Sequence, residues 1–277
     1  MLRSVLYMPS SNARALEKAK TIPADAIIFD LEDAVAPDAK PAARDAACAA
    51  VQSGQYGGRT LTIRCNGLDT PWGEEDLRAA AAAAPAAVVV PKVSGRDHLA
   101  RVAELVGDTP IWAMVETPPA IFDVRAIAGF DTVAVLVMGT NDLAKELRAA
   151  LVPGRAPLLP HLATALLGAR EAGLAILDGV YNDVQDADGF AAECRQGAEL
   201  GFDGKTLIHP SQVEVANRTW APTDDEVTYA RRVIAAFDEA SAAGKGVVTV
   251  DGRMIENLHV DNARVVLATA EAIAAKG

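Results

Sequence analysis

The chain contains 277 residues, 51% of them hydrophobic and 23% charged, which is enough to bury a full core in one large domain or two small ones. Its 26 basic and 37 acidic residues give a formal net charge of −11, which argues against nucleic acids and membranes as partners. Cys48, Cys65 and Cys194 are odd in number and lack the spacing of a metal site. Because the N-terminal segment also does not resemble a signal peptide, we expect a cytoplasmic protein with reduced cysteines.

Short apolar segments rich in β-branched residues alternate with helical patterns along most of the chain. We expect strands at residues 4–9, 26–32, 60–66, 87–93, 110–116, 133–139, 175–181 and 205–210. Continuous apolar strands between helices indicate a parallel sheet covered by helices. Eight such units in roughly 210 residues predict a (β/α)8 TIM barrel. A doubly wound open sheet is the alternative, although no glycine-rich nucleotide-binding fingerprint follows any of these strands.

The last quarter of the sequence has a different pattern. A helix is expected near residues 224–243, then a short strand within 247–252, and then a helix to the end. We therefore expect a barrel domain at residues 1–222 and a C-terminal helical extension at residues 223–277.

Each of the eight predicted strands ends in polar or charged residues. In chain order these are Ser10 and Asn12, Glu32 and Asp33, Arg64 and Asn66, Lys92, Glu116, Asp142, Asp178 and His209. Any one of them could be a helix cap or a loop residue. In a barrel, however, the carboxyl ends of the strands meet on the face that carries the active site. The pattern therefore predicts a polar site on this face.

Two of these residues are suited to a divalent cation. Glu116 and Asp142 follow neighbouring strands, so that their carboxylates can share one ion. Mg²⁺ takes one or two carboxylates and fills its remaining positions with water and substrate oxygens. Zinc prefers His or Cys, and His209 alone is well placed for it.

The neighbouring basic residues indicate an anionic substrate. Arg64 offers a planar fork for a carboxylate, and its alternative role is a structural salt bridge with Glu32 or Asp33. Lys92 and Lys205 could each form a Schiff base, but we favour an electrostatic role for Lys92 because the metal already supplies an electron sink. Together these residues favour metal-assisted chemistry on a 2-oxo or 2-hydroxy acid.

Several motifs, found in order along nearly the whole chain, resemble those of the citrate lyase β-subunit-like CoA-ester lyases of the HpcH/HpaI aldolase superfamily. They are "RSVLYMPSSNARALEKA", "DLEDAVAPDAK", "RCNGLD", "VPK", "VET", "GTNDL" and "GFDGKTLIHPSQ". The sequence looks most similar to malyl-CoA lyases and (3S)-malyl-CoA thioesterases. Three segments, "MGTNDLAKEL", "DGVYN" and "DGRMIENLH", are closest to the thioesterase branch.

This resemblance implies a barrel enzyme that depends on Mg²⁺, or on Mn²⁺, and acts on a short 3-hydroxyacyl-CoA. Glu116 and Asp142 match the family's metal ligands, and Arg64 matches the residue that holds the glyoxylate-derived carboxylate. The other matching positions are Glu32 and Asp33 near the metal waters, Tyr7, Asn12 and Lys18 at the CoA, and His209 in the last motif of the site.

The resemblance also gives the C-terminal extension a role. In the family this segment reaches over a neighbouring subunit of a homo-oligomer, a trimer or hexamer, and supplies an acid/base carboxylate. Glu256 matches that position, where the lyases usually carry Asp. The longer side chain fits a hydrolytic variant, so that malyl-CoA lyase and thioesterase activities both stay open. The alternative is a citrate lyase β-type subunit that works with a carrier-protein partner.

Overall fold

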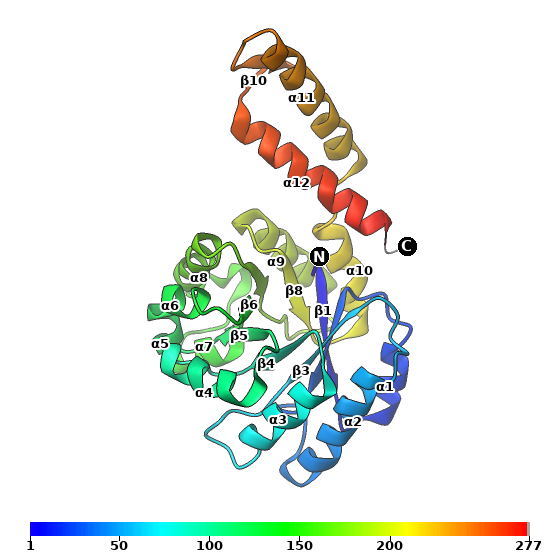
Figure 1. Ribbon diagram of the computed structural model, residues 1–277, viewed down its shortest axis with the longest axis vertical. Helices are drawn as coiled ribbons and strands as arrows, with labels where there is room; N and C mark the ends of the chain where they lie inside the picture. The colour runs from blue at the N-terminus through cyan, green and yellow to red at the C-terminus, as the bar shows by residue number, and fades with distance from the viewer. Residues whose placement is uncertain (276–277) are drawn as a thin grey trace. The chain divides into compact units, whose positions relative to one another are not determined.

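The computed structural model describes residues 1–275, and its larger compact unit, residues 2–217, is a closed barrel. Eight parallel strands pair in sequence order, and β8 pairs with β1 to close the barrel (Figure 1). The predicted TIM barrel is therefore confirmed. The strands are β1 Ser4–Pro9, β2 Ala26–Asp30, β3 Thr60–Arg64, β4 Ala87–Val90, β5 Ile111–Val115, β6 Val133–Met138, β7 Ala175–Asp178 and β8 Gly204–Leu207.

Helices follow the strands and surround the barrel (Figure 1). They are α1 Ala13–Ala19, α2 Lys40–Gln52, α3 Gly73–Ala83, α4 Arg96–Val106, α5 Pro118–Phe122, α6 Val124–Ala128, α7 Thr140–Leu147, α8 Leu159–Glu171, α9 Ala187–Leu200 and α10 Val213–Thr219. Short 3₁₀ turns lie at Pro37–Ala39, Pro153–Arg155 and Pro210–Gln212. Among the described residues, no helix is both long and apolar enough to cross a membrane.

The alternation of side chains along the strands connects the barrel core to its mouth. Val5 and Ile28 belong to one buried apolar cluster that also takes Met114, each from a different strand. Because side chains alternate with a period of two, the residues two positions later face the same interior. Those residues are Tyr7, Asp30 and Glu116, all at or just beyond strand ends. The alternation that points apolar side chains into the barrel core therefore also points polar side chains into the carboxyl end of the barrel.

Closure of the barrel requires a residue without a side chain at Gly204. A Cβ at this position would overlap the carbonyl of Leu2, at the point where β8 meets β1. The pairing that follows joins Ser4 to Lys205 and Leu6 to Leu207. Gly204 therefore lets the last strand approach the first closely enough to form the final row of backbone hydrogen bonds.

A buried ion cluster lies beneath the end of β7. The Oδ1 of Asp178 is 2.6 Å from the Nη1 of Arg155, and its Oδ2 is 2.9 Å from the Nζ of Lys205. Glu193 completes the cluster, with Oε1 2.8 Å from the Nζ of Lys205. Burial alone would raise the pKa of Asp178, but Lys205 and Arg155 outweigh it and hold the pKa below its usual value. Asp178 ends a strand as expected, yet it serves this cluster and does not line the cavity at the barrel mouth.

The C-terminal unit, from Arg218 onward, has a core of its own. Helices α11 Asp224–Ala242 and α12 Asn257–Ala274 pack with the hairpin of β9 Val248–Val250 and β10 Arg253–Ile255. The division after residue 217 lies close to the boundary that we placed after residue 222. Strand β10 was not expected, although the turn Asp251–Gly252, with positive φ at both residues, is a strong hairpin signal.

Replacing Asp178 by Asn should destabilise the barrel by roughly 3–5 kcal/mol, because Arg155 and Lys205 would lose a buried counter-charge. Chemical denaturation at pH 7 measures this difference. Because the pKa of Asp178 is lower in the folded state than in the unfolded state, the stabilisation is fully present above the unfolded pKa of about 3.9. It is lost as the pH falls from that value through the lower pKa of the folded state. The difference should therefore shrink in acid.

The exposed pair of Glu74 and Arg78 provides the matched control. Glu74→Gln should change the free energy of unfolding by less than about 0.5 kcal/mol. An Asp178→Asn protein as stable as the wild type would show that the cluster contributes little.

Candidate active site

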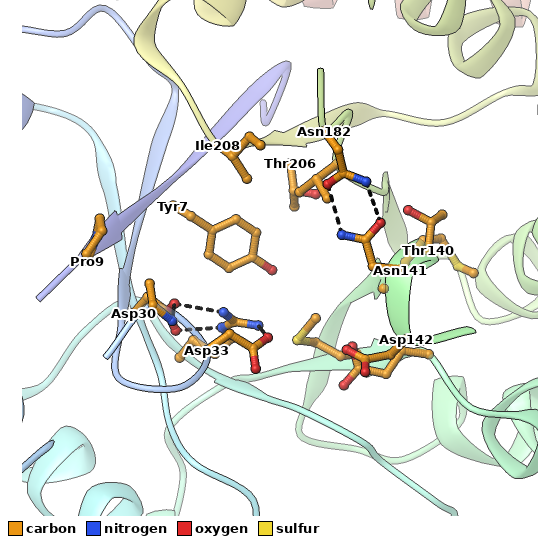
Figure 2. A pocket seen from close by; sticks show the side chains of 17 residues that line it. Tyr7, Pro9, Asp30, Asp33, Thr140, Asn141, Asp142, Asn182, Thr206 and Ile208 are labelled. Atoms are coloured by element: carbon orange, nitrogen blue, oxygen red, sulfur yellow. Dashed lines mark hydrogen bonds and ion pairs between the residues drawn. The ribbon is translucent and has the colours of Figure 1, made fainter. Parts of the chain in front are cut away.

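A cavity of about 330 Å³ opens at the carboxyl ends of the barrel strands (Figure 2). It is lined by residues from the ends of most strands and the loops that follow them. Five residues predicted from the sequence lie in this lining: Tyr7, Asp33, Arg64, Glu116 and Asp142. The structure thus brings together side chains that are more than 130 positions apart in the sequence.

Glu116 is one of the most buried polar residues in the lining of this cavity, with 1% of its surface exposed. Its Oε1 accepts a hydrogen bond of 2.7 Å from the main-chain N–H of Lys92. Burial raises the pKa of Glu116 to about 7, and the negative charges of Glu32 and Asp142 add to this rise. The two carboxylates of Glu116 and Asp142 thus form a region where a cation would be strongly favoured.

Gly139 makes room for this carboxylate. It lies between the end of β6 and the start of α7, the helix that carries Asp142, and a Cβ here would overlap the Oε2 and Cβ of Glu116. The requirement is steric, because the φ of Gly139 is −99° and is open to any residue. The glycine of the "GTNDL" motif therefore sets the position of Glu116.

The donor set fits a hard cation that completes its coordination with water and substrate. Among residues 1–275, no group of three or more His, Cys, Asp or Glu side chains is arranged to hold a metal. A closed structural zinc site would need four such ligands. Mg²⁺ needs one or two carboxylates, which Glu116 and Asp142 supply.

Arg64 is buried and surrounded by carboxylates. Its Nε and Nη2 each lie 2.7 Å from an oxygen of Asp30, which uses the bidentate edge of the guanidinium. Its Nη1 lies 2.7 Å from Glu32 and 3.4 Å from Asp33. The guanidinium carbon lies 4.7 Å from the centre of the Tyr7 ring. Arg64 can therefore reach a substrate through Nη1, while Asp30 fixes its orientation.

Asp30 is a site residue that the sequence reasoning passed over. It is the last residue of β2 and pairs in register with Arg64, the last residue of β3. The two residues occupy equivalent end positions on adjacent strands, which place their side chains on one face once the register is known.

Tyr7 and Lys92 have well-defined protonation states. Burial raises the pKa of the Tyr7 hydroxyl well above its usual value despite the opposing effect of Arg64, so it stays protonated and can donate. Burial alone would lower the pKa of Lys92, but a hydrogen bond of 2.6 Å to Glu32 outweighs it and raises the pKa. A firmly protonated amine is a poor nucleophile, which supports the electrostatic role of Lys92 over a Schiff base.

The other predicted site residues lie outside the lining of this cavity. Asn12 caps helix α1 through a hydrogen bond of 3.1 Å from the Ala15 N–H. Lys18 is exposed in the last turn of the same helix. His209 caps the turn Pro210–Gln212, with its Nδ1 2.8 Å from the Ser211 hydroxyl. Glu256 belongs to the C-terminal unit, directly before α12.

Replacing Gly139 by Ala should displace the Glu116 carboxylate and weaken Mg²⁺ binding by at least about tenfold. Isothermal titration of the purified chain with Mg²⁺ measures the change in Kd. Gly58→Ala is the control, because a Cβ at Gly58 would meet no atom within 4 Å. An unchanged Kd in the Gly139→Ala protein would contradict the steric role of this glycine.

Comparison with known proteins gives a consistent assignment. A family model described as HpcH/HpaI aldolase/citrate lyase matches residues 3–210, and one for C–C bond lyases of the TIM-barrel fold matches residues 156–274. A (3S)-malyl-CoA thioesterase of Cereibacter sphaeroides is 52% identical over 273 residues, covering 99% of this chain and 96% of the relative. The citrate lyase subunit beta of Escherichia coli is 35% identical, with 97% and 93% covered.

Among solved structures, the protein CitE from Mycobacterium tuberculosis, in complex with magnesium, acetoacetate and coenzyme A, has a TM-score of 0.81. It is 30% identical, and 97% of each chain is covered. These matches extend over the barrel and the C-terminal unit alike. The chain belongs to the HpcH/HpaI aldolase/citrate lyase family.

Proposed function

We propose that the chain is a Mg²⁺-dependent enzyme acting on malyl-CoA or a similar short 3-hydroxyacyl-CoA. It would hydrolyse the thioester to malate and CoA, or cleave the C–C bond to give acyl-CoA and glyoxylate, or do both. The observation that carries this proposal is the Glu116–Asp142 carboxylate pair beside the Arg64–Tyr7 contact in one cavity. The similarity to a (3S)-malyl-CoA thioesterase and to a CitE bound to magnesium and coenzyme A supports it.

Glu116 and Asp142 would hold the Mg²⁺, or Mn²⁺ in its place. When bound, the ion would polarise the oxygens of the 2-oxo or 2-hydroxy acid and stabilise negative charge that develops on them. The family resemblance supports this role for both residues. The raised pKa of Glu116 supports it too, because burial and the nearby carboxylates leave its charge uncompensated.

Arg64 and Tyr7 would bind the substrate carboxylate. The Nη1 of Arg64 has its weakest contact, 3.4 Å, with Asp33, whose side chain is 66% exposed. A substrate carboxylate could replace this contact without disturbing the two bonds to Asp30. The protonated Tyr7 hydroxyl provides a further donor beside it. Asp33, once released, is free to interact with water near the metal.

The CoA moiety would lie along α1, near Tyr7, Asn12 and Lys18, with Glu32 and His209 at the margins of the site. Lys18 is exposed and suits a phosphate of CoA. The free state of all three cysteines supports a cytoplasmic location.

Glu256 would act as acid or base in the site of a neighbouring subunit, within a homotrimer or homohexamer. Around it in the C-terminal unit, Met254 is 65% exposed and Leu258 is 53% exposed. Exposed apolar side chains on both sides of a carboxylate support contact with another surface. A citrate lyase β-type subunit acting with a carrier protein is the second candidate, supported by the relative that is 35% identical.

Incubating the purified chain with malyl-CoA and Mg²⁺ should release CoA with malate, or acetyl-CoA with glyoxylate, as measured by liquid chromatography. Glu116→Gln and Asp142→Asn should each lower kcat/KM by about 1,000-fold, because each removes a charged ligand at nearly constant volume. Circular dichroism should show an unchanged fold. Absence of turnover by the purified wild-type chain, together with activity on acyl-carrier-protein thioesters, would favour the second candidate.

A mixing experiment tests whether sites are shared between subunits. Glu256→Gln should lower kcat by about 100-fold, since a base acts in the transition state. Mixed oligomers of Glu256→Gln and Asp142→Asn chains should regain activity, because some sites would combine two intact contributions. Mixing Asp142→Asn with Glu116→Gln is the control and should restore nothing, since both residues line the same cavity. Mixed oligomers verified by native mass spectrometry that stay inactive in the first case would contradict the shared site.

A further inference from the structure

A second cavity, of about 490 Å³, adjoins the first one within the barrel unit. It lies between the loop of residues 150–158 and helix α9. Four residues line both cavities: Thr140, Asn141, Val180 and Asn182. The two spaces are therefore neighbours that share one wall, formed by the loops after β6 and β7.

The second cavity contains a buried donor without a partner. Arg155 is 5% exposed, and its Nη1 and Nε bond to Asp178 at 2.6 Å and to Gln196 at 3.0 Å. Its Nη2 is buried and has no hydrogen-bond partner among the described residues. Leaving a charged N–H group unsatisfied is costly, and a cavity of this size that includes polar side chains in its lining has room for water. Water that reaches this nitrogen from the cavity would satisfy it.

The shared wall is a pair of side-chain amides. The Nδ2 of Asn141 donates to the Oδ1 of Asn182 at 3.0 Å, and the Nδ2 of Asn182 donates back at 2.8 Å (Figure 2). The loops come this close because Gly179 lacks a side chain, which would otherwise overlap Thr140. Each amide still has one free N–H and a free lone pair on its oxygen. The pair can therefore bind water from the second cavity while it also lines the first cavity, where the substrate would react.

We propose that the second cavity supplies the water for thioester hydrolysis and that the Asn141–Asn182 pair positions this water. The inference rests on the proposed function and assigns its hydrolytic branch to particular residues. The water oxygen bonds to the thioester carbonyl carbon, and the C–S bond breaks. One water proton goes to the CoA thiolate, and the other leaves with the new carboxyl group, which ionises to give malate. Cleavage of the C–C bond consumes no water, so the pair controls the ratio of the two product sets.

The ratio of malate to glyoxylate formed from malyl-CoA tests this role. Asn182→Leu removes the amide at similar volume, and Ala192→Leu fills the second cavity from helix α9 without changing the pair. Both should lower the ratio by at least about tenfold. Asn182→Ser, which keeps a donor and an acceptor, should recover part of the loss. Ala187→Leu on the same helix lies outside the cavity lining and should leave the ratio unchanged.

The outcomes separate this inference from the proposed function. Normal turnover with unchanged ratios in Asn182→Leu and Ala192→Leu would overturn the water role and leave the function intact. A wild-type chain that forms only C–C cleavage products would likewise overturn it. If the wild type does not turn over malyl-CoA at all, the proposed function fails. A crystal structure of the wild-type chain tests the water site directly. Ordered waters linking Arg155 Nη2 to the amide pair would support the water role, and a dry second cavity would overturn it.

Discussion

The arrangement of the site depends on one buried guanidinium, that of Arg64. Three carboxylates, those of Asp30, Glu32 and Asp33, lie around it, and Tyr7 covers one of its faces. Without this cation the acidic residues after β2 would repel one another in a poorly hydrated space. Arg64 and Lys92 together neutralise most of the charge on this side of the barrel mouth. Glu116 and Asp142, after β5 and β6, have no such counter-ion among the described side chains that contact them. The imbalance between the two sides would favour a metal ion beside Glu116 and Asp142.

The same comparison of charges explains why another set of buried ionic residues is structural. Asp178 and Glu193 are matched by Arg155 and Lys205, so that two anions face two cations. Such a balanced cluster needs no further ion and has a lowered Asp178 pKa, in contrast to the raised pKa of Glu116. Position at a strand end therefore does not by itself make a residue functional. The balance of charge around it distinguishes the two cases.

The barrel could be predicted because strand and helix periods alternate clearly along the sequence, and Glu116 could be predicted because strand ends converge. Three features could not be predicted in this way. The bidentate Asp30–Arg64 pair depends on the register between two strands. The burial of Asp178 depends on Arg155, which reaches it from a 3₁₀ turn before α8. The steric role of Gly139 depends on the path of the Glu116 side chain. Each requires distances between segments, and the sequence pattern contains none.

The choice between hydrolysis and C–C cleavage follows from how the site is divided. In the proposed function, both reactions would hold the carboxylate of the substrate near Arg64 and its oxygens near Glu116 and Asp142, so these residues would not discriminate between them. Discrimination requires a group that acts in one reaction alone. Water is consumed only in hydrolysis, and the Asn141–Asn182 pair lies between the reaction space and the cavity that can hold it. Proton transfer from the substrate hydroxyl is needed for C–C cleavage, and in the proposed function the length of the side chain at Glu256 would affect that step. Water supply and base position are therefore separate physical variables, and a sequence can change one while keeping the rest of the site.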